Sequence, residues 1–375
     1  MHVLIAPDRL DLEGRIVSAP EIAAALASGW SAARALDEVV LRPLSTGDGG
    51  LVQAAVSAFG GDPEPALLSG PLGERVPITW WTDGDAAYLD GAALLGPPTS
   101  PAARDLAVHG SSAGVGELIL TAVAAGCRRI VVGVGDSGTH DGGVGALRAL
   151  AGGDVASLPE VMERARTRLH GVDVVVAAAT DRPLVGLSGS GAALAGRPGI
   201  NPGLAQEVEQ SILGAVAQIE AATQRPTSLL APSVPQHGQQ RGSRRPRSGA
   251  GGGLAFALEA IGARLRNGAD LIADATALPR DIGDADVVLT AATTLDGTAM
   301  ELGVPGAVGR LAMERMVPVV ALGVDVRLSR RELAGTGVEA VYPLHDQPSP
   351  GTPVPVADLD ALSRRASRVA RTWSR

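Results

Sequence analysis

The chain alternates between short apolar segments rich in Val, Ile and Ala and longer segments whose apolar residues recur at helical spacing. Each apolar segment ends in a polar or glycine-rich turn, which is typical of parallel strands buried on both faces. The expected strands are residues 2–6, 129–134, 173–177, 286–290 and 317–322. The expected helices are residues 20–36, 51–59, 114–125, 254–265 and 303–316. This order of elements predicts an α/β fold.

A different kind of sheet is expected within residues 62–91. Trp80, Trp81 and Tyr88 flank the turn Thr82-Asp83-Gly84-Asp85, a pattern that favours an antiparallel hairpin. Further along, residues 222–247 are rich in Gln, Pro, Ser, Arg and Gly. This composition cannot bury a core, and it predicts a flexible insertion.

The charge composition restricts the class of function. All 32 basic residues among the 375 are arginine, against 40 Asp and Glu, so the net charge is −8 and there is no lysine. An acidic balance argues against nucleic acid or an anionic membrane as the main partner. The absence of lysine excludes a Schiff base and the lysine of a Walker loop. With Cys127 alone, and with no signal peptide or transmembrane segment expected, the sequence predicts a cytoplasmic protein without disulfides.

The strongest chemical signal lies in residues 131–145, where a strand runs into a glycine-rich loop and then a helix. Backbone amides at such a helix start can bind a phosphate, although the spacing matches neither a Walker loop nor a dinucleotide fingerprint. A tight strand-to-helix connection explains the glycines equally well. The loop is unusually polar, with Asp136, Ser137, Thr139, His140 and Asp141. These side chains could hold magnesium or orient a hydroxyl substrate.

Three more acidic residues, Asp8, Asp48 and Asp296, follow predicted strands or begin predicted helices. The carboxyl ends of parallel strands meet at one edge of a sheet, where ligands bind. Each Asp alone is explained by a helix cap or a turn. Together they predict an acidic centre suited to phosphoryl chemistry.

These motifs resemble the bacterial type of glycerate kinase, in order and over nearly the whole chain. The matching segments are Ile5-Ala6-Pro7-Asp8, Pro43-Leu44 with Asp48-Gly49-Gly50, Gly70-Pro71-Leu72-Gly73, residues 114–119, residues 133–145, Pro183-Leu184, residues 249–254, and Asp296-Gly297. The resemblance implies a two-domain α/β protein. Residues 1–60 and 261–375 would form a flavodoxin-like parallel-sheet domain, and residues 61–260 a second, mixed-sheet α/β domain.

The resemblance also implies ATP- and Mg²⁺-dependent transfer of a phosphoryl group to a hydroxyl of D-glycerate or a related small hydroxy acid. The partners would be that acid and the nucleotide, and the protein could form a homodimer. The implied catalytic residues are Asp8, Asp48, Asp141 and Asp296, with Asp141 and Asp296 also as metal ligands. The implied substrate- and phosphate-binding residues are Gly135, Ser137, Thr139, His140, Gly142, Gly143, Gly251 and Gly252.

The chain departs from the family pattern at several charged positions. Ala292, Thr294 and Thr298 replace a Glu, an Arg and a Gln of the family, and Gly303 replaces a Lys. Losing one cation that contacts transferring phosphate costs on the order of 10²-fold in rate. Two hypotheses follow. Either arginines such as Arg9, Arg15, Arg182 and Arg197 supply the missing charge, or the chain is an inactive or re-specified paralogue that acts as a ligand-binding or regulatory module. The glycine spacing disfavours an NAD-dependent enzyme.

Overall fold

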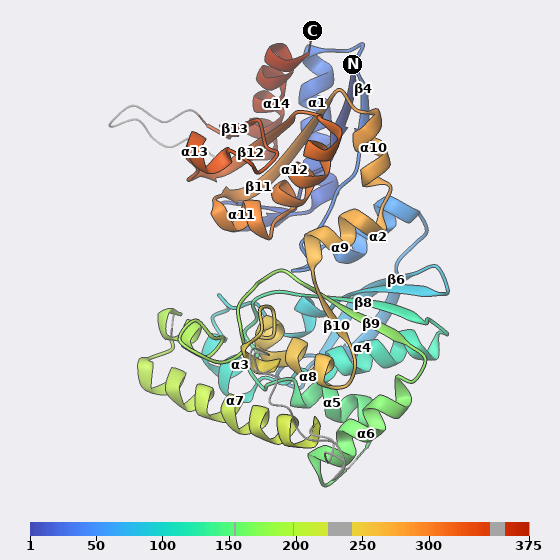
Figure 1. Cartoon of the computed structure of the whole chain (residues 1–375), viewed down its shortest axis with the longest axis vertical. Helices are drawn as coiled ribbons and strands as arrows, with labels where there is room; N and C mark the ends of the chain where they lie inside the picture. Colours follow the sequence, from blue (N-terminus) through green and yellow to red (C-terminus); the bar gives the residue numbers. More distant parts are fainter. Residues whose placement is uncertain (154, 198, 224–241, 346–356, 375) are drawn as a thin grey trace, which may run out of the picture. The chain divides into compact units, whose positions relative to one another are not determined.

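The computed structural model describes residues 1–153, 155–197, 199–223, 242–345 and 357–374 (Figure 1). The chain forms two compact units. Unit 1 consists of Met1–Thr46, Gln53–Gly61 and Gly268–Arg375, and unit 2 of Gly47–Val52 and Asp62–Asn267. Most of the expected flexible insertion, residues 224–241, lies outside the described residues.

Unit 1 contains a five-stranded parallel sheet. Its strands are β1 (His2–Ile5), β4 (Glu38–Leu41), β11 (Val287–Leu295), β12 (Val319–Val326) and β13 (Ala340–Pro343), in the order β4-β1-β11-β12-β13. Counted along the chain, this is the order 2-1-3-4-5 of flavodoxin-like sheets. The prediction of a flavodoxin-like parallel sheet is therefore confirmed.

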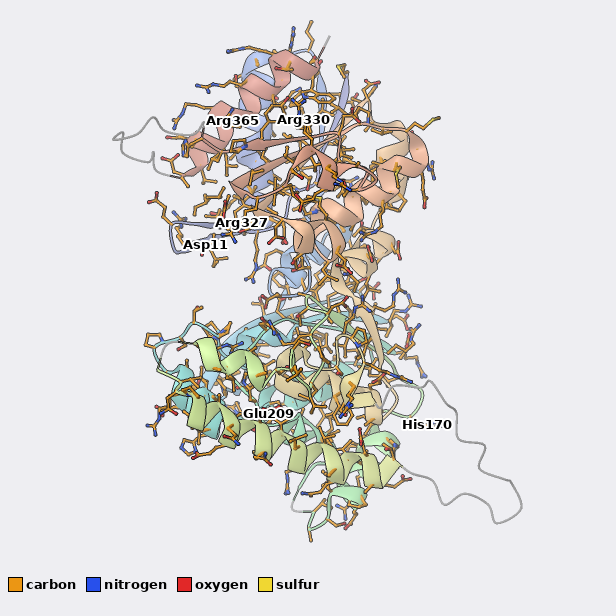
Figure 2. All side chains as sticks on the ribbon, turned by 60° about the vertical axis from the view of Figure 1, so that its left-hand side comes forward. Asp11, His170, Glu209, Arg327, Arg330 and Arg365 are labelled. Carbon is orange, nitrogen blue, oxygen red and sulfur yellow. The ribbon has the colours of Figure 1, made fainter. Side chains whose placement is uncertain are left out.

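Helices connect the strands of the sheet of unit 1. They are α1 (Ala19–Ala33), α2 (Leu51–Phe59), whose first two residues belong to unit 2, α9 (Gly268–Ala275), α10 (Leu278–Asp284), α11 (Gly297–Glu301), α12 (Val304–Arg315), α13 (Arg330–Leu333) and α14 (Leu359–Trp373); a small hairpin joins β2 (Leu10–Leu12) and β3 (Arg15–Val17). Val3, Ile5 and Leu289 share one core cluster with α1 and α14. Within α14, Arg365 is 8% exposed, and its Nε donates to the carbonyl of Leu344 (Figure 2).

Unit 2 contains a six-stranded mixed sheet. Its strands are β5 (Glu64–Ser69), β6 (Arg75–Thr82), β7 (Ala86–Asp90), β8 (Arg129–Val134), β9 (Asp173–Ala178) and β10 (Arg264–Asn267), in the order β10-β9-β8-β7-β6-β5. Strands β7 to β10 are parallel, whereas β5, β6 and β7 pair antiparallel. The expected hairpin joins β6 to β7, and the rings of Trp81 and Tyr88 meet edge to face across it at 5.7 Å. The predicted second type of sheet is confirmed.

The helices of unit 2 pack around this sheet. They are α3 (Ala103–His109), α4 (Ala113–Ala124), α5 (Val144–Ala151), α6 (Leu158–Arg168), α7 (Pro202–Thr223) and α8 (Leu254–Ala260), with 3-10 turns at Gly91–Leu94, Ala192–Gly196, Gly242–Arg244 and Ala250–Gly253. Glu209 marks the long helix α7 in Figure 2. No single helix in the described ranges is long and apolar enough to cross a membrane, although the bent pair α3 and α4 passes by length and composition.

One predicted helix differs from the structure. The helix expected over residues 254–265 ends at Ala260, and residues 264–267 form the edge strand β10. Gly262 has φ +116°, a conformation that breaks the helix. Because β10 lies at the edge of the sheet and alternates Arg with Leu and Asn, it lacks the continuous apolar character used to predict strands.

Close packing of α4 on α5 predicts different effects for two Gly→Ala substitutions. A Cβ at Gly116 would lie 2.8 Å from the Cβ of Ala149, whereas a Cβ at Gly214, within α7, would meet nothing within 4 Å. We expect Gly116→Ala to destabilise the protein by about 2 kcal/mol through overpacking. Gly214→Ala should stabilise it by about 0.5–1 kcal/mol through helix propensity. Urea unfolding measures both changes, and equal effects would contradict the packing argument.

Candidate active site

The glycine-rich loop of unit 2 connects β8 to α5, and its hydroxyl groups bond within the protein. The Oγ of Ser137 donates to the carbonyl of Thr139 at 2.8 Å, and the Oγ1 of Thr139 donates to the carbonyl of Leu95 at 2.8 Å. Both residues are buried. The predicted binding residues Ser137 and Thr139 therefore use these bonds to shape the loop.

Asp141 holds this loop to two helices. Its carboxylate accepts four hydrogen bonds, from the amide and the hydroxyl of Ser112, the amide of Gly143 and the amide of Gly145, at 2.8–3.0 Å. The hydroxyl of Ser112 also accepts the amide of Ala146 at 2.9 Å. The carboxylate thus binds the first amides of α5, where the helix dipole favours a negative charge. These amides, which the sequence predicted to face a phosphate, donate inside unit 2.

A second glycine-rich turn packs against the loop. The amide of Gly251 donates to the carbonyl of Gly135 at 2.8 Å, and the amide of Gly142 donates to the carbonyl of Gly252 at 3.1 Å. Gly252 has φ +61°, and a Cβ there would lie 2.9 Å from the Cα of His140. The structure therefore brings all eight predicted binding residues together in unit 2. The glycines permit the close approach of the two turns.

His140 is buried in the loop and neutral at pH 7. Only 5% of it is exposed, and its Nδ1 lies 2.9 Å from the carbonyl oxygen of Gly138. A carbonyl can only accept, so Nδ1 carries the proton and Nε2 is an acceptor. Burial lowers the pKa of His140 to about 4. The hydrogen bond to Gly138 acts in the opposite direction, whereas the positive charges of Arg197 and Arg182 lower the pKa further.

Charged residues gather at the start of the loop. The Nε of Arg182 lies 3.5 Å from the Oδ1 of Asp136, and the Nη1 of Arg197 donates to the carbonyl of Ser137 at 2.7 Å. Burial lowers the pKa of Arg197, Asp136 raises it, and Arg182 lowers it further. Two guanidinium groups and one carboxylate thus meet beside Ser137 and His140.

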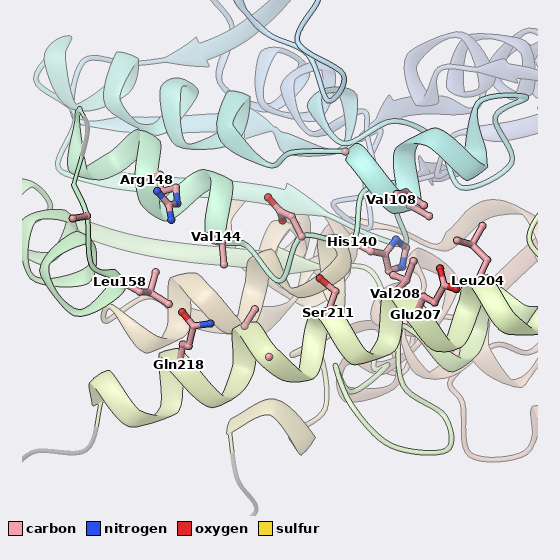
Figure 3. Close-up of a pocket in the computed structure, with 16 residues that line it drawn as sticks. Val108, His140, Val144, Arg148, Leu158, Leu204, Glu207, Val208, Ser211 and Gln218 are labelled. Atoms are coloured by element: carbon pink, nitrogen blue, oxygen red, sulfur yellow. The ribbon is translucent and has the colours of Figure 1, made fainter.

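A groove of about 560 Å³ lies between the loop, α5 and α7 (Figure 3). Figure 3 shows His140, Arg148, Ser211 and Gln218 along its length, with Glu207 and several apolar residues. The volume is within the range of small-molecule sites.

The four predicted catalytic carboxylates divide between the units. In unit 2, Asp48 lies beside Gly135, where a Cβ would be 2.6 Å from its Oδ1, and Asp141 holds the loop. In unit 1, the amide of Asp8 donates to the carbonyl of Ala291, and Asp296 caps α11 by accepting the amide of Ala299 at 2.9 Å. Asp8 follows β1 and Asp296 follows β11. Asp8 and Asp296 therefore lie at the carboxyl ends of strands, and Asp48 lies next to Gly135, which follows β8.

Two further residues of this region were not predicted. Ser112 is fully buried and links Asp141 to α5. Asp90, at the end of β7, accepts the amides of Leu51 and Val52 at 3.0 and 3.3 Å. A Ser directly before an apolar helical segment is a recognised helix-start signal that could have identified Ser112. No local signal connects Asp90 to residue 51.

The comparisons with known proteins identify relatives along the full chain. The family model described as "Glycerate kinase family" matches residues 3–374. An uncharacterised protein of Mycobacterium bovis is 33% identical, covering 91% of this chain and 83% of its own. The glycerate 2-kinase of Escherichia coli is 28% identical, with 91% and 90% covered. A crystal structure described as a glycerate kinase 2 from Salmonella typhimurium LT2 superposes with a TM-score of 0.74 at 26% identity, covering 99% of this chain and 98% of that one.

Removing the Asp141 carboxylate should unfold the loop. Asp141→Ala leaves the Ser112 and Gly143 amides and the buried Ser112 hydroxyl without their acceptor, so we expect a loss of about 3 kcal/mol. Asp105→Ala, at an exposed position of α3, should change stability by less than about 0.5 kcal/mol. Urea unfolding compares the two, and an equally small effect at Asp141 would mean that these bonds do not hold the loop.

His140 predicts a pH-dependent stability. An unfolded His has the ordinary pKa of 6.5, whereas His140 in the fold has a pKa of about 4. Neutral His140 therefore contributes fully to the free energy of unfolding above pH 6.5. This contribution is lost as the pH falls towards 4, because the unfolded chain takes up the proton first. Its full size is roughly 3 kcal/mol. We expect His140→Gln to reduce the loss of stability between pH 7 and pH 4.5. Urea unfolding at both pH values measures it, with His109→Gln on the exposed end of α3 as the control; equal pH dependence in the two variants would contradict it.

Proposed function

The chain belongs to the glycerate kinase family, and from this premise we propose that it catalyses ATP-dependent phosphoryl transfer to a hydroxyl of D-glycerate or a related small hydroxy acid. The observation that carries the proposal is the glycine-rich loop of residues 135–143, which retains the family motif and follows β8 at the carboxyl edge of the parallel strands of unit 2. In open α/β sheets ligands bind at this edge. Phosphoryl transfer depends mainly on positioning and charge neutralisation, which such a loop can provide.

We assign different roles to the two carboxylates of unit 2. Asp48 lies beside Gly135, so it can accept the proton of the substrate hydroxyl as a general base. Asp141 accepts hydrogen bonds through both carboxylate oxygens. It is therefore a positioning residue that fixes the loop, in place of the metal-binding role expected from the sequence.

The residues fit a magnesium ion that arrives with the nucleotide. Across the described residues no group of three or more His, Cys, Asp and Glu could hold a metal by itself. Magnesium commonly binds one or two carboxylates together with substrate phosphates and water. We propose Asp296, which follows β11 in unit 1, as a carboxylate ligand of this ion. The bound ion would neutralise phosphate charge.

A specific observation favours the alternative, a paralogue that binds ligand without glycerate kinase turnover. Gly303 stands where the family has Lys, and a Cβ at this position would lie 2.7 Å from the carbonyl oxygen of Ala299. A side chain at this position would require the turn between α11 and α12 to shift. Ala292 and Thr294 of β11 have also lost the charges of the family motif. A kinase with this sequence must use positively charged side chains at other positions to neutralise the phosphate.

Turnover tests the proposal directly. With ATP, Mg²⁺ and D-glycerate, the purified chain should form phosphoglycerate above a protein-free control, detected by ³¹P NMR. Asp48→Asn should lower kcat by about 10²-fold, because it removes the general base. Asp62→Asn, at an exposed position of the same unit, should keep wild-type activity.

The other outcomes are equally informative. Equal product from wild type and Asp48→Asn would indicate a contaminating kinase. No product, together with a rise in Tm on adding ATP or D-glycerate, would support the ligand-binding alternative through the linkage of binding to stability.

A further inference from the structure

We propose that Arg182 and Arg197 form a binding site for an oxyanion beside Asp136 and His140 in unit 2. The ligand group is the carboxylate of the hydroxy acid or a phosphate of the nucleotide. The inference rests on the proposed function for the identity of the ligand, and on the geometry of unit 2 for the existence of the site.

The two arginines reach one loop from different parts of the chain. Strands β8 and β9 are parallel neighbours whose last residues, Val134 and Ala178, pair in register. Asp136 and Arg182 follow these strands, so both lie at the carboxyl edge of the sheet. Arg197 comes from the segment after the 3-10 turn Ala192–Gly196 and donates to the carbonyl of Ser137. The sheet edge and the loop together thus position two guanidinium groups.

Charged side chains crowd this point. Asp136 raises the pKa of both Arg197 and His140, whereas Arg182 lowers both. His140 is neutral at pH 7 and adds no charge. Arg182 lies at the carboxylate of Asp136 and Arg197 donates to the carbonyl of Ser137, one residue further along, and Arg182 lowers the pKa of Arg197 as a neighbouring like charge does. An anion bound between them would relieve this repulsion.

One donor of the site is also unsatisfied. The Nε of Arg182 is inaccessible to solvent and has no hydrogen-bond partner among the described residues. Asp136 is 3.5 Å away, and the contact is an ion pair without hydrogen-bond alignment. Leaving a buried N–H without an acceptor is unfavourable. A carboxylate or phosphate oxygen would satisfy it, and the planar guanidinium fork matches both groups.

Another arginine of the same sheet shows the contrast. Arg264 opens β10 and donates to both oxygens of Asp173, at 2.6 and 2.8 Å. Both residues are at the amino ends of their strands, the opposite edge of the sheet. Arg264 therefore has its own carboxylate with aligned hydrogen bonds, whereas Arg182 and Arg197 share Asp136. At the carboxyl edge, in contrast, Arg182 keeps a buried Nε that has no acceptor among the described residues.

Calorimetric titration of the full chain tests the inference with three probes: D-glycerate, ADP and inorganic phosphate. Arg182→Gln should weaken the binding of at least one probe tenfold or more, and Arg182→Lys should restore part of it, because it keeps the charge and loses the fork. Asp136→Asn should bind that probe several-fold more tightly, because the competing carboxylate is gone. Arg264→Gln is the matched control and should bind as wild type.

The pattern of losses identifies the ligand group. Weaker binding of D-glycerate alone assigns the carboxylate, and weaker binding of ADP or phosphate assigns a phosphate; either supports the site. The inference is overturned if wild type binds none of the probes, or if Arg182→Gln binds all three as wild type does. If Arg182→Gln does not fold, Asp136→Asn is the deciding variant. Probe binding by Asp136→Asn that is equal to or weaker than that of the wild type then overturns the proposed site. A turnover assay separates the two proposals. If the Arg182 variants change probe binding as expected but the wild type forms no phosphoglycerate, only the proposed kinase activity is refuted. If the wild type forms phosphoglycerate but Arg182→Gln binds all three probes as wild type does, only the proposed oxyanion site is refuted.

Discussion

The carboxylate of Asp141 is the interaction on which the candidate site depends. It joins Ser112 at the start of α4 to Gly143 and Gly145 at the start of α5, across 29 residues of sequence. Both helices pack on the mixed sheet through the same core cluster. Because Asp141 fixes where α5 begins, it also fixes the preceding loop, including His140 and the carbonyl of Ser137. A displacement of this carboxylate would leave the amides of Ser112, Gly143 and Gly145 without their acceptor.

This arrangement decides where a ligand anion can bind. The start of a helix is normally a ready anion site, since its first amides have no partner within the helix. In α5 these amides already bind Asp141 and the hydroxyl of Ser112, so the protein supplies its own anion. A substrate carboxylate or phosphate must find positive charge elsewhere on the loop. Arg182 and Arg197 provide it at the opposite end, next to Asp136.

The sequence predicted the elements that have a strong local pattern. The strand at 129–134 and the helix at 51–59 coincide with β8 and α2, because their apolar residues follow a clear period. Strand β10 was missed, since at the sheet edge it can be polar. The glycine-rich loop was found from its composition, but the role of Asp141 was not, because its partner Ser112 is distant in sequence and hydrogen-bond direction has no sequence signature. The pairing of Arg182 with Asp136 likewise requires knowing that β8 and β9 are neighbours.

The absence of lysine has a different meaning at different positions. Arg264 pairs with Asp173 at an exposed strand start, where an ion pair contributes little to stability and the choice of cation matters less. At the glycine-rich loop, a lysine in place of Arg182 could offer only a compact charge on a flexible stem, whereas a guanidinium can contact Asp136 and still present further donors. Gly303, in contrast, is packed too closely against Ala299 to accept any side chain without a shift. The positive charge near the glycine-rich loop therefore comes from unit 2, where Arg182 contacts Asp136 and Arg197 donates to the carbonyl of Ser137.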